Sequence, residues 1–486
     1  MKCIESQFGG NEFRVSSAAR HIDWHNTILL LLLLALSACG GGGSGNPATS
    51  EETPFQFGLS GPGDSENRFP LAVGNFWIYQ GAETSTNGIL HYHNVAYVDR
   101  TVQQQGVDAV VVMQTNELAE GTSDTYQLVD AHGVATLGSS DPKSPDALLA
   151  PYWNALFPTQ VGDRFVQLDR TNIDFGEDLD SDSINERADI RSEVFVQSIS
   201  TISSILTDYP DALRLDRSAS FDLRLSANGS QLNLESTESV YLVPSIGVAK
   251  HQVQINLDGE STTTVETLAA YSISGSGNAG YASITGAVTE HQVDGTAYFS
   301  LAAVKGERYV VALTGINGAV DLIPLLPNTC LQANTASNGS SPQDCFMQAA
   351  TNRLLVAVES SVSASFVLAV ANATNSVNPA NEVRLDIVAD QLTAAQVGPR
   401  GTSRYAATGL VNGQHTVSIL GLSGDADLHV YADDTYSLEL DCTLRGVGDI
   451  NSAPEECTVD ATSNLYFQVS SGQLNTLGAT FFILVN

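Results

Sequence analysis

The stretch Gly421-Leu-Ser-Gly-Asp-Ala-Asp-Leu-His-Val-Tyr431 has a weaker copy earlier in the chain, Gly315-Ile-Asn-Gly-Ala-Val-Asp-Leu322. Each copy is followed by two cysteines fifteen positions apart: Cys330 and Cys345 in the first, Cys442 and Cys457 in the second. A glycine turn that leads into a short apolar run is typical of a β-strand after a tight turn. A repeated β module with a disulfide in each copy explains both features.

The spacing between the copies indicates an internal duplication. Gly315, Gly318 and Asp321 recur 106 positions later, whereas the cysteines recur at 112. Offsets that stay constant within motifs and change only between them are the mark of a repeat. We therefore predict two tandem β-sandwich modules, residues 281–373 and 385–486, joined by a linker at 374–384.

These modules resemble the pre-peptidase C-terminal domain family. The second module carries the family's pattern in order: Asn412-Gly413-Gln414, Gly424 to Tyr431, Cys442 with Cys457, and Leu465 to Val469. The first keeps only Gly318, Asp321 and Leu322 of the central motif. The resemblance implies a β-sandwich or jelly roll that accompanies secreted enzymes or adhesins without being the enzyme. Some members of that family bind calcium or polysaccharide.

The N-terminus predicts export and lipidation. Residues 27–38 form a short apolar run, too short to span a bilayer as a helix and suited to a signal peptide. The ending Leu36-Ser37-Ala38-Cys39 resembles a bacterial lipobox, which implies cleavage after residue 38 and a lipid on Cys39. Position 40 is Gly and not the Asp that retains lipoproteins in the inner membrane, so by analogy with lipoprotein sorting the expected destination is the outer membrane, if the cell has one. Residues 39–68 are rich in Gly, Ser and Pro and predict a flexible tether.

Residues 69–273 predict an antiparallel β domain. β-rich runs separated by Ser, Asn, Gly and Asp fill it, and one helical patch is expected at 145–156. Its opening, Phe69 to Tyr79, and the later run Tyr241 to Lys250 resemble a domain of uncharacterised bacterial lipoproteins. That resemblance implies a curved antiparallel sheet or a barrel-like domain. The stretch Ser274 to Gly280 is expected to be a linker.

The charge balance excludes one class of partner. Against 21 Lys and Arg stand 54 Asp and Glu, which gives a formal net charge of −33. Nucleic acids are bound largely through basic side chains on phosphates, so no nucleic-acid partner is expected. The acidic excess fits cation binding, life in salty water, or simply a solvated acidic surface.

One acidic run is a candidate calcium site. Between residues 178 and 189 the chain places carboxylates at alternating and then wider intervals: Asp178, Asp180, Asp182, Glu186 and Asp189. Calcium prefers six to eight oxygen ligands, and a turn with alternating Asp supplies them. The run resembles the loops of EF-hand, dockerin and thrombospondin type 3 repeats, but has Ser183 where they have Gly. A solvated acidic loop is the alternative.

The aspartates of the repeated motif have a structural explanation. Asp321 and Asp427 precede apolar strands, where a carboxylate can accept backbone N–H bonds and fix the start of the strand. A cation shared by Asp425 and Asp427 is the alternative, but residue 319, the counterpart of Asp425, is Ala.

No catalytic motif is present in the sequence. His-Glu-x-x-His and Gly-x-Ser-x-Gly are both absent. We therefore expect a non-catalytic envelope lipoprotein whose β domains bind or display at the cell surface. The ligand would be a polysaccharide or a protein, with calcium as a possible stabiliser. An accessory to a secreted hydrolase, or an undetected hydrolase in residues 69–273, is the alternative.

Overall fold

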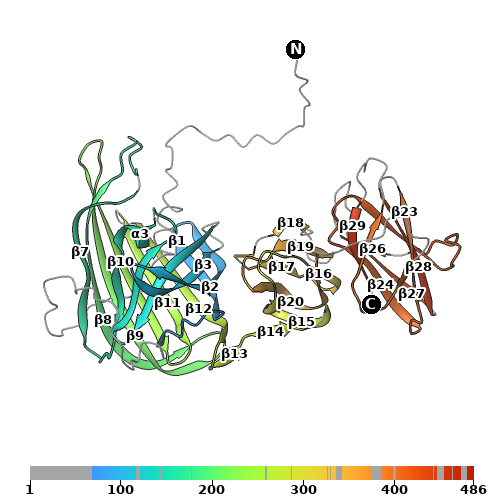
Figure 1. Ribbon diagram of the computed structural model, residues 1–486, viewed down its shortest axis with the longest axis horizontal. Coiled ribbons are helices and arrows are strands. Elements are labelled where there is room, and N and C mark those ends of the chain that lie inside the picture. The colour runs from blue at the N-terminus through green and yellow to red at the C-terminus, as the bar shows by residue number, and fades with distance from the viewer. Residues whose placement is uncertain are drawn as a thin grey trace, which may run out of the picture.

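The structure is a computed structural model that describes residues 68–486 apart from 117–120, 143, 177, 258–259, 286, 326, 329, 335–341, 374–384, 398–400, 442, 446–453, 462 and 472–478. Figure 1 shows one large β unit followed by two smaller ones. Within the described residues, the one complete helix is α3 (Pro145–Leu149). The prediction of an all-β chain, with a curved barrel-like domain followed by two β-sandwiches, is confirmed.

The first unit is built on one antiparallel sheet, called the large sheet below. Its order is β6-β5-β4-β3-β2-β1-β12-β11-β10-β9-β8-β7, with β13 beside β12. The strands are β1 (Phe76–Ser85), β2 (Gly88–Gln104), β3 (Val107–Asn116), β4 (Gly121–Asp130), β5 (Gly133–Ser139), β6 (Tyr152–Leu156), β7 (Arg164–Asp174), β8 (Arg187–Ser203), β9 (Asp208–Arg224), β10 (Gln231–Val243), β11 (Gly247–Leu257), β12 (Glu260–Ile273) and β13 (Gly277–Ala279).

The large sheet curls until its two edge strands, β6 and β7, lie beside each other. The Gln167 side chain on β7 donates to the carbonyl oxygen of Trp153 on β6, 2.9 Å away. Arg170 reaches across the same seam to the carbonyl oxygens of Leu149 (2.5 Å) and Pro151 (3.2 Å). Side chains thus join the edges where backbone pairing stops, and the sheet is nearly closed.

Apolar side chains from the two edge strands of the large sheet meet inside the curled sheet. Trp153 of β6, Phe165 of β7 and Leu242 of β10 share one buried cluster. Trp77 and Leu268 belong to a second cluster under β1 and β12. Burial of this apolar surface is the main driving force for closing the sheet.

One local prediction for this region is wrong. The helix expected at 145–156 stops at Leu149, and residues 152–156 form β6. Pro151 explains the break, because it lacks an N–H and disfavours the helical conformation at the residue before it. The linker expected at 274–280 contains β13, which pairs with β12 from Tyr271↔Ala279 to Ile273↔Gly277.

The first sandwich comprises β14 (Tyr281–Ile284), β15 (Val288–Ala302), β16 (Arg308–Asn317), β17 (Asp321–Pro324), β18 (Cys330–Asn334), β19 (Gln343–Gln348) and β20 (Arg353–Asn372). Its order is β14-β15-β20-β16-β19-β18, and β17 also pairs with β20. The start of β20 pairs with β17, and its end pairs with β16. One long strand therefore serves both layers of the sandwich.

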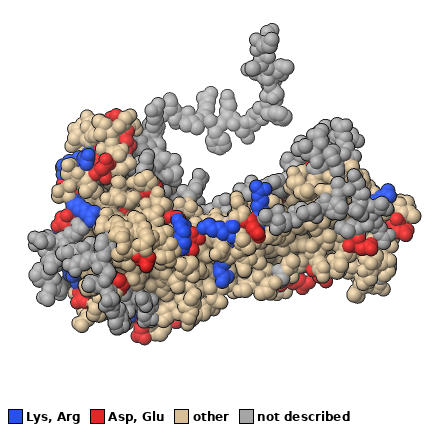
Figure 2. All heavy atoms as spheres, viewed as in Figure 1, with Lys and Arg blue, Asp and Glu red and all other residues tan. Residues whose placement is uncertain are grey.

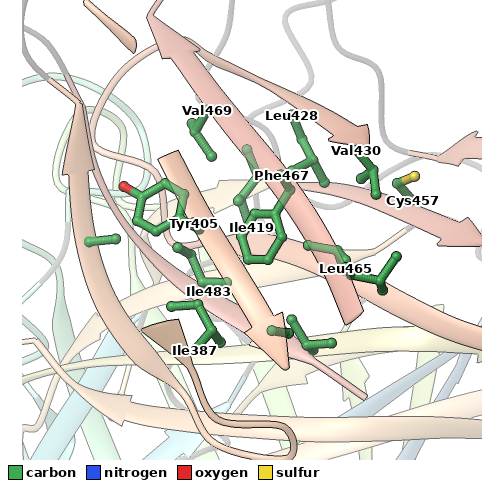
Figure 3. Packing of buried hydrophobic residues seen from close by; sticks show 14 of the residues in the cluster. Ile387, Tyr405, Ile419, Leu428, Val430, Cys457, Leu465, Phe467, Val469 and Ile483 are labelled. Carbon is green, nitrogen blue, oxygen red and sulfur yellow. The ribbon is translucent and has the colours of Figure 1, made fainter. Parts of the chain in front are cut away.

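The second sandwich comprises β21 (Leu385–Ile387), β22 (Thr393–Val397), β23 (Thr402–Thr408), β24 (Gly413–Leu420), β25 (Ala426–Tyr431), β26 (Thr443–Arg445), β27 (Glu455–Ala461), β28 (Asn464–Ser471) and β29 (Ala479–Val485). It has two sheets, β21-β23-β28-β25 and β22-β29-β24-β27-β26. Figure 3 shows the core between them, where Tyr405 and Phe467 of one sheet face Ile419 and Ile483 of the other.

The two sandwiches contact each other through equivalent strands and equivalent bonds. Val310 and Val367 of the first pack against Leu420 and Phe482 of the second. The pair of polar contacts is reciprocal: Asp344 accepts the N–H of Gly421 at 2.6 Å, and Glu456 accepts the N–H of Gly315 at 2.9 Å. Gly315 and Gly421 are repeat equivalents, and Asp344 and Glu456 each precede the second cysteine of their module. The same contact is thus made twice.

The large sheet packs its outer face on the first sandwich. Phe76, Val95 and Tyr97 of the sheet share a buried cluster with Tyr298 and Leu355 of the sandwich. At the rim, the Lys305 ammonium lies 3.0 and 3.1 Å from the carboxylate oxygens of Asp99. In Figure 2 basic side chains gather in the middle of the visible face, where the two units meet.

Candidate functional site

The acidic run predicted to bind calcium forms a compact loop between β7 and β8. Ligand oxygens of Asp178, Asp180 and Glu186 all lie within 4.8 Å of one another. Ser183, which occupies the position of the missing glycine, adopts a φ of 71°. The sharp turn that such loops require is therefore present despite the serine.

Backbone N–H groups hold these three carboxylates in place. Glu186 is fully buried and accepts from Leu179 (3.1 Å) and Ser226 (2.7 Å). Asp180 accepts from Ala227 at 2.9 Å, and Asp178 accepts from Asp182 and Ser183 at 3.1 and 2.7 Å. Ser226 and Ala227 belong to the β9–β10 turn, so the cluster links two neighbouring hairpins.

One oxygen of this cluster has no hydrogen bond. Among the described residues, Oδ1 of Asp180 is buried and accepts from no donor. A buried carboxylate oxygen without a donor is costly, and a cation is one group that can satisfy it. Asp178, Asp180 and Glu186 are the side chains that could hold such an ion.

Two of the five predicted ligands do not join the cluster. Asp182 accepts the hydroxyl of Ser226 at 2.8 Å. Asp189 accepts the N–H of Asn172 at 2.7 Å and forms an ion pair with Arg224. The pKa of Asp189 is lowered, chiefly by the bond from Asn172 and then by Arg224. Because β8 begins at Arg187, strand alternation turns Asp189 away from the loop and toward Arg224.

The aspartates of the repeated motif do not fix the strand starts as predicted. Asp321 and Asp427 are exposed. The N–H of Leu322 donates to Gln343, and the N–H of Leu428 donates to Glu455, both at 2.8 Å. Neither acceptor was predicted from the sequence. Their equivalent positions in the repeat could have identified them, because each lies two residues before the second cysteine of its module.

Carboxylates crowd the motif of the second sandwich. Burial, with a smaller contribution from the charges of Asp427 and Asp425, raises the pKa of Glu455 to about 7. Burial also raises the pKa of Asp425, and Asp427 adds to that shift. Residues 425–427 and 455 thus form a region of negative potential at one end of β25.

The predicted disulfide of the first sandwich is confirmed: Cys330 and Cys345 are bonded, with their Cα atoms 5.3 Å apart. Cys457 is also disulfide-bonded. Its predicted partner Cys442 lies outside the described residues, as do the predicted lipidation site Cys39 and the segments 1–38 and 39–67.

An internal ion network that the sequence did not reveal crosses the interior of the large sheet. Six strands contribute its side chains: Tyr92, Asn94, Glu266, His251, Glu238, Arg217 and Gln167. At its centre, His251 Nε2 lies 2.6 Å from Glu238, and His251 Nδ1 lies 3.6 Å from Glu266. Arg217 binds the second oxygen of Glu238 at 2.6 Å.

Hydrogen bonds extend this network to both sides. Tyr92 and Asn94 each donate to Glu266 at 2.9 Å. Arg217 donates to Gln167 at 3.2 Å, and Gln167 continues to the seam strand β6. The ring of Tyr92 fits only because residue 81 is glycine: a Cβ there would lie 2.2 Å from the ring.

The charges of the network balance. Burial alone would lower the pKa of His251, but Glu238 and Glu266 outweigh it and raise the pKa to about 9. At neutral pH an imidazolium and a guanidinium thus face two carboxylates. His251, Glu238 and Glu266 are 4, 2 and 3% exposed. A protonated imidazole held between two carboxylates is not available as a base, so this geometry supports the sheet rather than a hydrolytic reaction.

No family model and no curated protein matches the chain. Among solved structures, it is similar to an exported protein with a YmcC-like fold from Bacteroides fragilis, at 10% identity and a TM-score of 0.23. The match covers 40% of this chain and 94% of that protein. Within the described part, no helix is long and apolar enough to cross a bilayer.

Proposed function

We propose that this chain is a non-catalytic binding protein of the bacterial cell envelope, anchored by a lipid on Cys39 and stabilised by calcium in its large sheet. The tether would hold three β units off the membrane, most naturally the outer membrane. Their ligand would be a polysaccharide or a protein. The observation that carries the calcium part is the meeting of Asp178, Asp180 and Glu186.

The chemistry of this cluster supports calcium over other divalent cations. All its side-chain ligands are carboxylate oxygens, which calcium accepts in variable number and geometry. Asp180 supplies an oxygen with no other partner among the described residues. Because the cluster also binds the β9–β10 turn, an ion there would tie two hairpins together and stabilise the large sheet.

Calcium titration of the full chain tests this proposal. We expect binding heat in calorimetry and a melting temperature that rises with Ca²⁺, because an ion that binds only the folded state adds about 2.7 kcal/mol at a hundredfold excess over Kd. Asp180→Asn should weaken binding at least about tenfold, because it removes the ligand charge. Magnesium should compete poorly, since it demands a stricter octahedral geometry.

Asp182→Asn is the matched control, because Asp182 belongs to the same loop but lies outside the cluster. Its calcium affinity should stay within about twofold of the parent chain. Absence of both heat and thermal shift at millimolar Ca²⁺, or equal losses in the two variants, would remove calcium from the proposal.

A further inference from the structure

One face occurs in both sandwiches, on β17 and β20 in the first and on β25 and β28 in the second, but its surroundings differ between them. In the first sandwich, β17 pairs with β20 as Asp321↔Glu359, and in the second β25 pairs with β28 as Asp427↔Ser470. The register therefore aligns the outward side chains of the two modules position by position. The aligned pairs are Tyr298 with Arg404, Ile323 with His429, Leu325 with Tyr431, Leu355 with Tyr466 and Ala357 with Gln468.

In the first sandwich this face is an interface. Tyr298, Leu325, Leu355 and Ala357 are buried in the cluster that they share with the large sheet. The face is apolar, as expected for a permanent contact within one chain. The position in the fold is thus one that binds protein.

In the second sandwich the equivalent face is not apolar. Arg404 is exposed, and Tyr431 and Tyr466 are half-buried. The second sandwich meets the first through its other sheet, which carries Leu420 and Phe482. The face of β23, β28 and β25 therefore points away from the contact between the sandwiches.

Tyrosine rings are fixed on this face. Tyr436 stands between Tyr431 and Tyr466, with ring centroids 5.6 and 6.2 Å away and nearly perpendicular planes. The guanidinium of Arg404 lies 4.9 Å from the Tyr436 ring, and the Tyr436 hydroxyl donates to the carbonyl oxygen of Tyr405 at 3.0 Å. We call Arg404, Tyr431, Tyr436 and Tyr466 the tyrosine face.

The loop that carries Tyr436 is held by one carboxylate. Asp433 accepts the N–H groups of Thr435, Ser437 and Leu438 at 2.9, 3.3 and 2.6 Å. The Thr435 hydroxyl also donates to Asp433, and this bond, followed by the three backbone bonds, lowers the pKa of Asp433 to about 2. A loop fixed in this way loses little entropy when a ligand binds, which favours affinity.

Acidic groups border the tyrosine face. Strand alternation places Asp427 and His429 on the same side of β25 as Tyr431, and Glu439 binds His429 at 2.8 Å. Residues 385–486 contain twelve Asp and Glu, three Arg and no Lys. A partner that meets this surface would be favoured by positive charge.

We propose that the tyrosine face binds a lysine- and arginine-bearing segment of a partner protein. Tyrosine and arginine are the residues that most often dominate protein interfaces, and cationic side chains stack on tyrosine rings. The copy of this face in the first sandwich already binds a protein surface. This inference rests on the proposed binding function, but it concerns a module remote in sequence from the calcium loop, so the two can fail separately.

The test uses the full chain and an array of synthetic fifteen-residue peptides in three matched sets, with net charges of +4, 0 and −4. Neutral polysaccharides, laminarin and xylan, form a fourth arm. We expect binding to the +4 set that falls as ionic strength rises from about 0.05 to about 0.5 M. Tyr431→Ala and Tyr466→Ala should each weaken it at least about tenfold. Asp427→Asn should weaken it with no change in melting temperature, because Asp427 is exposed.

Tyr241→Ala is the matched control: Tyr241 is a half-buried tyrosine of the large sheet, flanked by Arg214 and Lys250 at 5.7 and 5.9 Å. It should bind the +4 peptides as the parent does. No binding of these peptides, or equal losses in the face variants and the control, would overturn the proposal. Binding of laminarin or xylan that the same face variants abolish would assign the face to a glycan instead.

Discussion

At the scale of single residues, His251 is the central link of the internal ion network. It lies between Glu238 and Glu266. Without its positive charge, these two buried carboxylates would be compensated by the Arg217 guanidinium alone. Breaking such a buried pair by removing one partner costs about 3 to 5 kcal/mol, because the remaining charge loses its compensation. Trp77 and Trp153 both lie inside the large sheet and report its unfolding by fluorescence.

We predict that His251→Gln lowers the unfolding free energy of the large sheet by about 3 to 5 kcal/mol in urea. His91→Gln, on the exposed end of β2, should change it by less than about 0.5 kcal/mol. The difference between parent and His251→Gln should depend on pH. Because the folded-state pKa of His251 is raised to about 9, its contribution is complete below about pH 6.5 and is lost as the pH rises through 9.

A stability difference that stayed constant from pH 6 to pH 10 would show that the imidazolium charge is not what holds the network.

The network itself could not be predicted from the sequence. His251 pairs with Glu266 only through the β11–β12 register, and with Glu238 only through β10. Polar residues at inward positions of a strand look, in sequence, like breaks in an apolar alternation.

At the scale of elements, strand composition predicted most of the large sheet. Runs such as Val107–Asn116 and Gly247–Leu257 are rich in β-branched residues and end at turn residues. The misplaced helix at 145–156 contains Leu148, Leu149 and Leu156, whose spacing fits a helix, but Pro151 divides it. The clustering of acidic side chains at 178–189 was predicted only in part: Asp178, Asp180 and Glu186 meet, whereas the start of β8 turns Asp189 away from them.

The two reciprocal bonds between the sandwiches make a prediction that belongs to this scale: Gly315 of β16 donates to Glu456 of β27, and Gly421 after β24 donates to Asp344 of β19. Asp344→Ala should speed hydrogen exchange at the Gly421 amide, and Glu456→Ala should do so at Gly315, because each amide loses its acceptor. Each variant should cost about 1 to 3 kcal/mol, with Glu456 at the upper end since it also accepts the Thr314 hydroxyl at 3.0 Å.

Asp460→Ala, an exposed carboxylate on the same strand as Glu456, should leave both amides unchanged. Protection at Gly315 and Gly421 that survives the loss of both acceptors would mean that packing alone joins the sandwiches.

The contact between the sandwiches could not be predicted from the sequence. Val310, Val367 and Phe482 look like core residues until the register shows that they face outward.

At the scale of the whole molecule, the proposed lipid anchor would make the cellular location of the chain depend on Cys39. We predict that Cys39→Ser moves the protein from the membrane fraction to the soluble fraction of the producing cell, because in the proposed arrangement this one residue would carry the lipid anchor. Fractionation followed by immunoblotting measures the change. Cys3→Ser, which lies before the expected cleavage site, should leave the chain in the membrane fraction. Equal distribution of Cys39→Ser and the parent chain would exclude the lipid anchor.

The reciprocal contact between the two sandwiches has the form of a twofold-symmetric dimer interface made within one chain. In such an isologous arrangement each surface is satisfied by its equivalent, so the assembly is closed at two units. A head-to-tail contact between repeats would instead leave one copy of the surface unfilled at each end and invite a further module or a second molecule. Because each copy of the duplicated surface is buried against the other, the repeat does not propagate into a fibre. Any attachment to another molecule must therefore use a different face.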